Sequence, residues 1–166
     1  MSMIPMLLKE MDLEANTTRK MLSRIPDDKL DWRPHPKSMV MRDLAVHIAE
    51  IPTWVALALH TDGLDFATMP YAPTPIETNA ELLALFEKSL AEGRTALSAA
   101  TDTDLTPTWT LRNGDTIYST DTVGETIRHA FAQTTHHRAQ LGVYLRLLDI
   151  PIPGSYGPSA DDPGTW

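Results

Sequence analysis

The segment QTTHHRAQLGVYLR, residues 133–146, carries two adjacent histidines in front of an apolar stripe. Histidine nitrogens and side-chain oxygens are donors that bind zinc and similar divalent ions in proteins. On an α-helix, residues four apart lie almost above one another, so His137 shares a face with Gln133, whereas His136 is turned away from it. If one of the adjacent histidines is a metal ligand, the spacing favours His137.

A second candidate ligand, His47, lies in a different apolar-periodic segment, beside a stripe that includes Leu44 and Ile48. In that position it could face a cleft between two helices. A single histidine beside an apolar face is more often a hydrogen-bonded packing residue than a ligand. Considered together with Gln133 and His137, the packing interpretation and the metal-site interpretation are about equally favoured, and both stay open.

The remaining histidines are weaker candidates. His129 lies on a similar face to Gln133, but it is two turns from His137, about 12 Å along the helix axis, too far for both to bind one ion at about 2 Å. We expect it at the rim or facing solvent. His35 and His60 have no partner at ligand spacing, and we assign them no role.

Charged and polar neighbours of these histidines also have ordinary interpretations. Asp43 and Glu50 flank His47 and are typical of a solvated helix face. Either could instead accept a hydrogen bond from an imidazole N–H and so orient a metal-bound histidine. Arg138 and Gln140 are better candidates for hydrogen bonds between helices than for catalysis.

Composition narrows the possible chemistry. The chain has no cysteine, which excludes disulfides and thiolate ligands, so a metal would be held by histidine and oxygen donors. The 14 Lys and Arg against 22 Asp and Glu give a net charge of −8, which does not favour nucleic acid or an anionic membrane as partner. No segment approaches the roughly 20 apolar residues of a membrane span, and no phosphate loop or Gly-x-Ser-x-Gly elbow occurs. We expect a soluble, cytoplasmic protein.

Four amphipathic segments must position the candidate residues. Apolar side chains recur at helical spacing over residues 4–25, 39–60, 79–100 and 122–148. Pro52 lies inside the second segment and should kink it. A capping box at Thr122 and Glu125 begins the last. Four helices of this length in 166 residues predict an all-α four-helix bundle that forms a single domain, residues 1–166.

Three connections are not short helix-to-helix turns. Residues 61–77 are rich in proline and long enough to cross one end of a bundle, as a wall or lid. Asn113 and Gly114 lie between two β-prone runs, which predicts a small β-hairpin with a two-residue turn before the last helix. Residues 151–166 are rich in Pro and Gly, and we expect a C-terminal tail rather than another helix.

Three segments, LDWRPHPKSMVMRDLAVHIAE, THHRAQLGVYLR and IPIPGSYGPSADD, together resemble the DinB/YfiT-like superfamily of bacterial proteins, over nearly the whole chain. The resemblance implies a four-helix bundle, commonly a homodimer. It further implies that one histidine of the second helix and a His-x-x-x-His pair of the last helix bind a divalent metal, zinc or nickel. By this correspondence His47 is the first ligand and His137 the last.

The chain departs from the superfamily pattern at Gln133, which stands where the first histidine of the pair is usual. In one branch a glutamate occupies this position, so an oxygen donor there is compatible with the geometry. Glutamine offers a neutral carbonyl oxygen, a weaker ligand than carboxylate or imidazole for these metals. The resemblance therefore implies a metal site made of His47, Gln133 and His137.

Two functions of different classes follow from this resemblance. The first is an enzyme whose metal keeps an open position for a small-molecule substrate. Characterised branches use a low-molecular-weight thiol such as bacillithiol or mycothiol, which implies a thiol S-transferase or a related transferase, isomerase or hydrolase. The second is a non-catalytic dimeric bundle with a degenerate metal site that binds a small molecule. Metal analysis of the purified protein separates them, since the enzyme requires close to one metal per chain.

Overall fold

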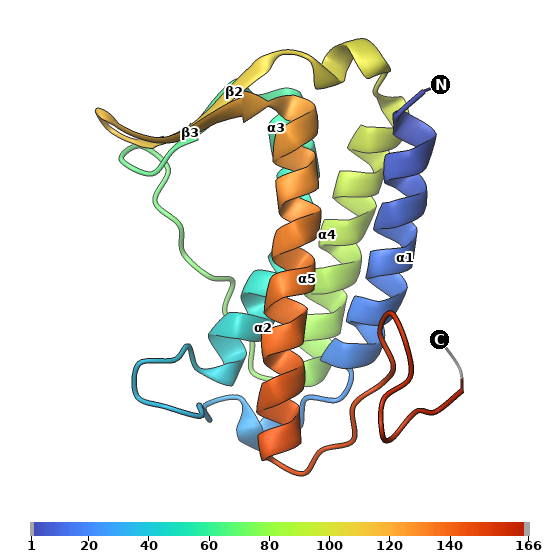
Figure 1. Cartoon of the computed structure of the whole chain (residues 1–166). Helices are drawn as coiled ribbons and strands as arrows, with labels where there is room; N and C mark the ends of the chain where they lie inside the picture. Colours follow the sequence, from blue (N-terminus) through green and yellow to red (C-terminus); the bar gives the residue numbers. More distant parts are fainter. Residues whose placement is uncertain (1, 165–166) are drawn as a thin grey trace.

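The computed structural model describes residues 2–164, and within them it is mostly helical with a small three-stranded sheet (Figure 1). The α-helices are α1 (Ile4–Leu22), α2 (Met41–Glu50), α3 (Thr53–His60), α4 (Asn79–Ala99) and α5 (Val123–Leu147). The strands are β1 (Gly63–Asp65), β2 (Thr108–Asn113) and β3 (Thr116–Thr122). Two short 3-10 helices, η1 (Asp27–Lys29) and η2 (Asp102–Leu105), lie in connections. None of the helices within residues 2–164 has the length and apolar character needed to cross a membrane.

Proline at position 52 divides the second expected helix into two. α2 ends at Glu50 and α3 begins at Thr53, because proline lacks an N–H and its ring clashes with the preceding turn. The Thr53 hydroxyl donates to the Glu50 carbonyl at 2.8 Å, which satisfies a carbonyl left open at the end of α2. α4 passes close to this break, since a Cβ built on Gly93 would lie 2.2 Å from the Pro52 carbonyl oxygen.

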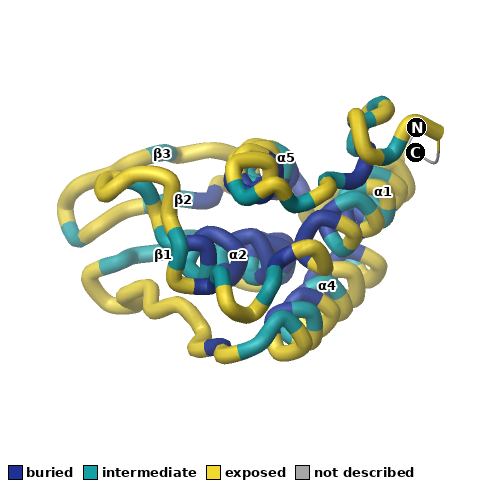
Figure 2. Tube along the Cα trace, turned by 90° about the horizontal axis from the view of Figure 1, so that it is seen from below, coloured by how far each residue is buried: buried dark blue, intermediate teal, exposed yellow. Residues whose placement is uncertain are grey.

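Two clusters of buried side chains join the helices. The first connects α1, α2, α4 and the end of α5, through residues such as Leu22, Leu44, Phe86 and Leu141. The second connects α1, α3, the end of α4 and the start of α5, and it includes Trp109 of β2. Figure 2 shows the buried parts of α1, α2 and α4 turned toward the centre of the molecule.

The start of α5 is set by the capping box that the sequence predicts. The Thr122 hydroxyl accepts from the Glu125 backbone N–H at 3.2 Å, and Glu125 Oε2 accepts from the Thr122 backbone N–H at 2.8 Å. This hydrogen bond lowers the pKa of the Glu125 carboxyl below its ordinary value. Thr78 and Glu81 form the same arrangement at the start of α4.

The hairpin before α5 is present as the antiparallel pair β2 and β3, and its turn lies one residue later than expected. Asn113 pairs with Thr116, so the two turn residues are Gly114 and Asp115. Gly114 takes a positive φ of 57°, a conformation that glycine adopts without strain. A third strand that the sequence pattern does not predict, β1, pairs with β2 in parallel.

The segment after α5 returns along α5 toward α1 and is attached there through a buried arginine (Figure 1). Arg138 of α5 is 2 % exposed, and its guanidinium donates to Glu14 Oε2 at 2.6 Å and to the Thr18 hydroxyl at 3.1 Å, both on α1. It also donates to the Tyr156 hydroxyl at 3.0 Å. The interhelical hydrogen bonds expected of Arg138 are therefore formed.

Candidate functional site

The structure brings together two of the predicted ligands, His47 of α2 and His137 of α5. Their ring centroids are 4.6 Å apart in an edge-to-face arrangement, and both side chains are half-buried. Imidazole nitrogens that share one divalent ion each lie about 2 Å from it. Rings that share one ion must be neighbours, and these two rings, on helices α2 and α5 that pack together, meet that requirement. His136 is exposed, as the rotation of the helix predicts.

Both imidazoles are in surroundings that favour the neutral form. Burial lowers the pKa of His47, and the nearby His137 lowers it further, while Glu50 acts in the opposite direction. Burial also lowers the pKa of His137, against a smaller opposing effect of its hydrogen bond to Gln140. Since neutral imidazole is the form that binds a metal, protons compete weakly for this pair near neutral pH.

Gln140 selects one tautomer of His137. The Oε1 of Gln140 lies 2.9 Å from His137 Nδ1, and because an amide oxygen only accepts, Nδ1 carries the proton and Nε2 carries the lone pair. The amide nitrogen of Gln140 lies 3.2 Å from His136 Nε2 and donates to it. The contact between Gln140 and His137 is of the kind that orients metal-binding histidines. Both partners of Gln140 lie on α5, so the prediction that it makes an interhelical hydrogen bond is wrong.

Gln133, the third predicted ligand, is half-buried one turn before His137. Its Nε2 lies 3.2 Å from His129 Nε2. With the amide N–H donating to His129, the carbonyl Oε1 is the atom of this side chain left to bind a metal. The predicted ligand set of His47, Gln133 and His137 would consist of two imidazole nitrogens and one neutral oxygen. Among residues 2–164, no three histidine, cysteine or carboxylate side chains are grouped so as to hold a metal.

The sequence pattern favours a solvated helix face for Glu50. In the structure Glu50 is half-buried instead, and it holds the connection between β1 and α4. Its Oε2 accepts from the Tyr71 hydroxyl at 2.9 Å, and its Oε1 accepts from the Thr74 backbone N–H at 3.1 Å. Burial raises the pKa of the Tyr71 hydroxyl, and the hydrogen bond to Glu50 raises it further, so the hydroxyl keeps its proton and donates. Glu50 therefore fixes a wall beside His47.

A cavity of about 800 Å³ adjoins His47 and Gln133. Volumes of this order are typical of small-molecule sites. Its wall is mostly apolar and comes from α3, α4, the sheet and the connection after β1: Trp54, Leu57, Leu64, Phe66, Met69, Tyr71, Leu85, Trp109 and Leu111. The connection is thus a wall of the cavity, one of the two roles expected of it.

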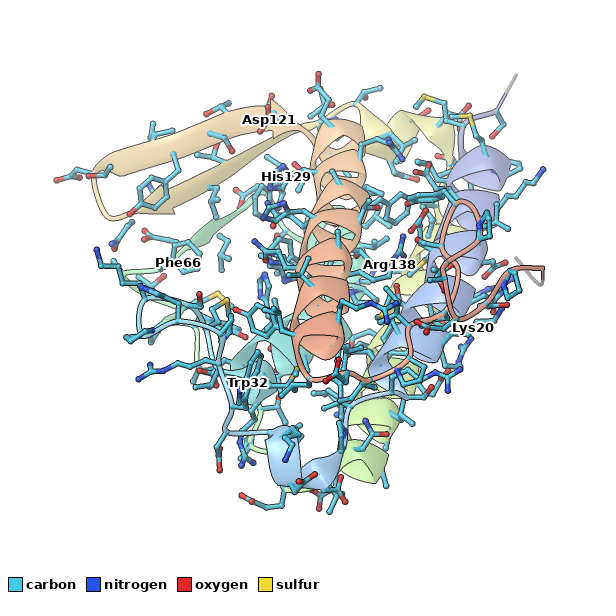
Figure 3. All side chains as sticks on the ribbon, turned by 60° about the horizontal axis from the view of Figure 1, so that its bottom comes forward. Lys20, Trp32, Phe66, Asp121, His129 and Arg138 are labelled. Atoms are coloured by element: carbon cyan, nitrogen blue, oxygen red, sulfur yellow. The ribbon has the colours of Figure 1, made fainter. Side chains whose placement is uncertain are left out.

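Figure 3 shows His129 and Arg138 on opposite sides of α5. His129 extends to the side of the sheet and Phe66, whereas Arg138 lies on the other side, toward α1. His129 is exposed and lines the cavity, which agrees with the rim position expected for it. The aromatic wall residues carry no motif in the sequence. Of these wall residues, the sequence pattern points only to those within residues 61–77, the connection that is expected to form a wall or lid.

Comparisons with known proteins give one family and several structural neighbours. The model of the DinB family matches residues 1–164. The uncharacterized protein YrdA of Bacillus subtilis is 24% identical over 156 residues, which are 93% of this chain and 89% of that protein.

The structural neighbours share the fold at low sequence identity. A DinB-like protein from Bacillus cereus superposes with a TM-score of 0.68 at 21% identity, covering 89% of this chain and 94% of that one. A DinB-like protein from Bacillus subtilis gives 0.68 at 16% identity, covering 89% and 96%. A mycothiol-dependent maleylpyruvate isomerase gives 0.60 at 15% identity, covering 84% of this chain and 60% of the isomerase. With the family match over residues 1–164, the chain belongs to the DinB family.

Proposed function

We propose that this chain is a divalent-metal-dependent enzyme that transfers a low-molecular-weight thiol to an electrophilic small molecule. The observation that carries the proposal is the pair His47 and His137, with ring centroids 4.6 Å apart beside an apolar cavity of about 800 Å³. A mycothiol-dependent isomerase with the same fold supports a thiol as the co-substrate.

In this proposal the scaffold is a four-helix bundle in which α2 and α3 together act as one interrupted helix, followed by the Pro- and Gly-rich tail. Residues 1–166 form one domain, and the protein works in the cytoplasm as a homodimer. The short gap between α2 and α3, residues 51–52, supports treating them as one helix, because α4 and α5 pack against both.

The residues present fit a zinc or nickel ion held by His47, Gln133 and His137. When bound, the ion would supply Lewis-acid activation of the thiol. Gln140 keeps the His137 Nε2 lone pair available, and Gln133 adds a neutral oxygen. In the net reaction a sulfur–carbon bond forms, the bond from carbon to the leaving group breaks, and the thiol proton departs with the leaving group.

The proposed role of the cavity wall is to bind the electrophile. The apolar side chains hold the electrophile in a place from which water is excluded, which limits its hydrolysis. The contacts of Tyr71 and Thr74 with Glu50 keep the connection in place over this space.

A second candidate function is a non-catalytic member of the family with a degenerate metal site that binds a small molecule. The observation that favours it is the Gln133 side chain, whose amide nitrogen contacts His129 and whose oxygen is the weakest of the three donors.

Metal analysis of protein purified without a metal-affinity tag tests the proposal. We expect close to one zinc or nickel per chain, lost in His137→Ala and kept in the matched control His136→Ala, whose side chain is exposed. The loaded protein should then consume a thiol in the presence of a chromogenic electrophile, and His137→Ala should not. A metal-free parent would favour the second candidate, and equal loss of metal in both variants would contradict the choice of His137 over His136 as the ligand.

A further inference from the structure

The charged groups of the cavity lie at its rim or are already bonded. Lys88 is the one lysine or arginine among its lining side chains, and it is exposed, as are Glu92 and Asp121. The fourth charged group, Glu50, uses both carboxylate oxygens to hold the connection. Apart from its histidines, the lining has three carboxylates and one ammonium group, so its charged side chains give no excess of positive charge that would attract an anion.

The interior of the cavity presents aromatic and aliphatic surface. Trp54 is half-buried, with its ring 5.6 Å from the His47 ring. Trp109 is 6 % exposed, and its indole N–H already donates to the Thr61 hydroxyl at 3.1 Å, so it offers the cavity ring surface. Aromatic rings favour offset and edge-to-face partners, and these two indoles provide such surfaces from α3 and β2.

We propose that the cavity binds an uncharged small molecule that carries an aromatic ring, in preference to an anion of the same shape. Its role as the electrophile rests on the proposed function, whereas its binding does not require the metal. An anion would lose hydration inside the apolar wall and would meet the rim carboxylates of Glu92 and Asp121. The same ring without charge meets neither cost.

Calorimetric titration with two naphthalene probes of matched shape tests this inference. The uncharged probe is naphthalenemethanol, and the anionic probe is naphthoate. The chelator-treated, metal-free protein is the decisive sample, because a carboxylate could bind directly to a metal. We expect naphthalenemethanol to bind saturably and at least tenfold more tightly than naphthoate.

Two variants locate the binding. Trp54→Ala should weaken naphthalenemethanol binding about tenfold, since it removes an aromatic surface of the wall. Ile117→Ala removes an apolar side chain that is 63% exposed on β3 and does not line the cavity, and it should leave the affinity unchanged. Circular dichroism of both variants verifies that they are folded. Leu111→Asp, which places a charge on the wall, gives a second test that should also reduce binding.

The inference is overturned if naphthoate binds as tightly as naphthalenemethanol, if neither saturates, or if both wall variants bind like the parent. These outcomes are separate from those of the metal analysis. A metal-free protein that still prefers the uncharged probe would support the inference and contradict the thiol-transfer proposal. A protein that is purified with metal, but whose metal-free form does not bind naphthalenemethanol, would contradict the inference and leave the thiol-transfer proposal supported.

Discussion

Removal of the Glu14 carboxylate should be among the most destabilising single changes outside the apolar core. Glu14 Oε2 lies 2.6 Å from the Arg138 guanidinium, and the two side chains are 12% and 2% exposed. The guanidinium also donates to the hydroxyls of Thr18 and Tyr156, but neither carries a charge. In Glu14→Ala the arginine would stay buried without a counter-charge.

The expected loss follows from this burial. Removing one partner of a buried ion pair costs about 3–5 kcal/mol, against a total stability of about 5–15 kcal/mol for a typical domain. At roughly 3 °C per kcal/mol for a chain of this size, the melting temperature should fall by about 10 °C. Replacing both partners, as in Glu14→Leu with Arg138→Met, should cost far less, because no charge is left buried.

Urea unfolding followed by far-UV circular dichroism measures these differences. Glu14→Gln is the matched control. Its amide oxygen can still accept from Arg138, so its free energy of unfolding should lie between those of the parent and Glu14→Ala. A loss of less than about 1 kcal/mol in Glu14→Ala, or a double variant as unstable as Glu14→Ala, would contradict the stabilising role of this buried ion pair.

Three further outcomes are expected. Gln133→His should bind zinc or nickel more tightly than the parent in calorimetric titration, and Gln133→Ala about tenfold more weakly or worse; if neither His nor Glu at this position raises affinity, the residue does not face the metal. Gly93→Ala should lower the free energy of unfolding, measured with urea, by about 1–3 kcal/mol, because its Cβ would meet the Pro52 carbonyl oxygen at 2.2 Å, whereas Gly157→Ala meets nothing within 4 Å and should be neutral. The pKa of Glu125 is lowered from 4.5 in the folded state, so its stabilising contribution is complete above that value and disappears as pH falls through the folded pKa. Glu125→Gln should therefore melt below the parent at about pH 7, and a gap that stays the same at about pH 3 would contradict this assignment.

Local sequence determined the positions of the helices and the rotation of side chains around them. Helical spacing of apolar residues predicts four helical segments, and the structure has five α-helices within residues 2–164 because Pro52 divides one segment. The capping box at Thr122 begins α5 as predicted. The same local geometry places His136 outside and His137 toward His47. Each of these properties depends on residues within a few positions of one another, and backbone periodicity is enough to predict it.

Tertiary structure alone decided which faces meet. Glu14 and Arg138 are 124 residues apart, and neither carries a local sign of its partner. Trp54 and Trp109 come from α3 and β2, and they line the same cavity because β2, which pairs with β1, packs against the helices. Periodicity states which side of an element is apolar, but the partner of that side is selected by packing between segments distant in sequence. For this reason the candidate histidines could be named from the sequence, whereas of the cavity beside them only the wall formed by residues 61–77 could be.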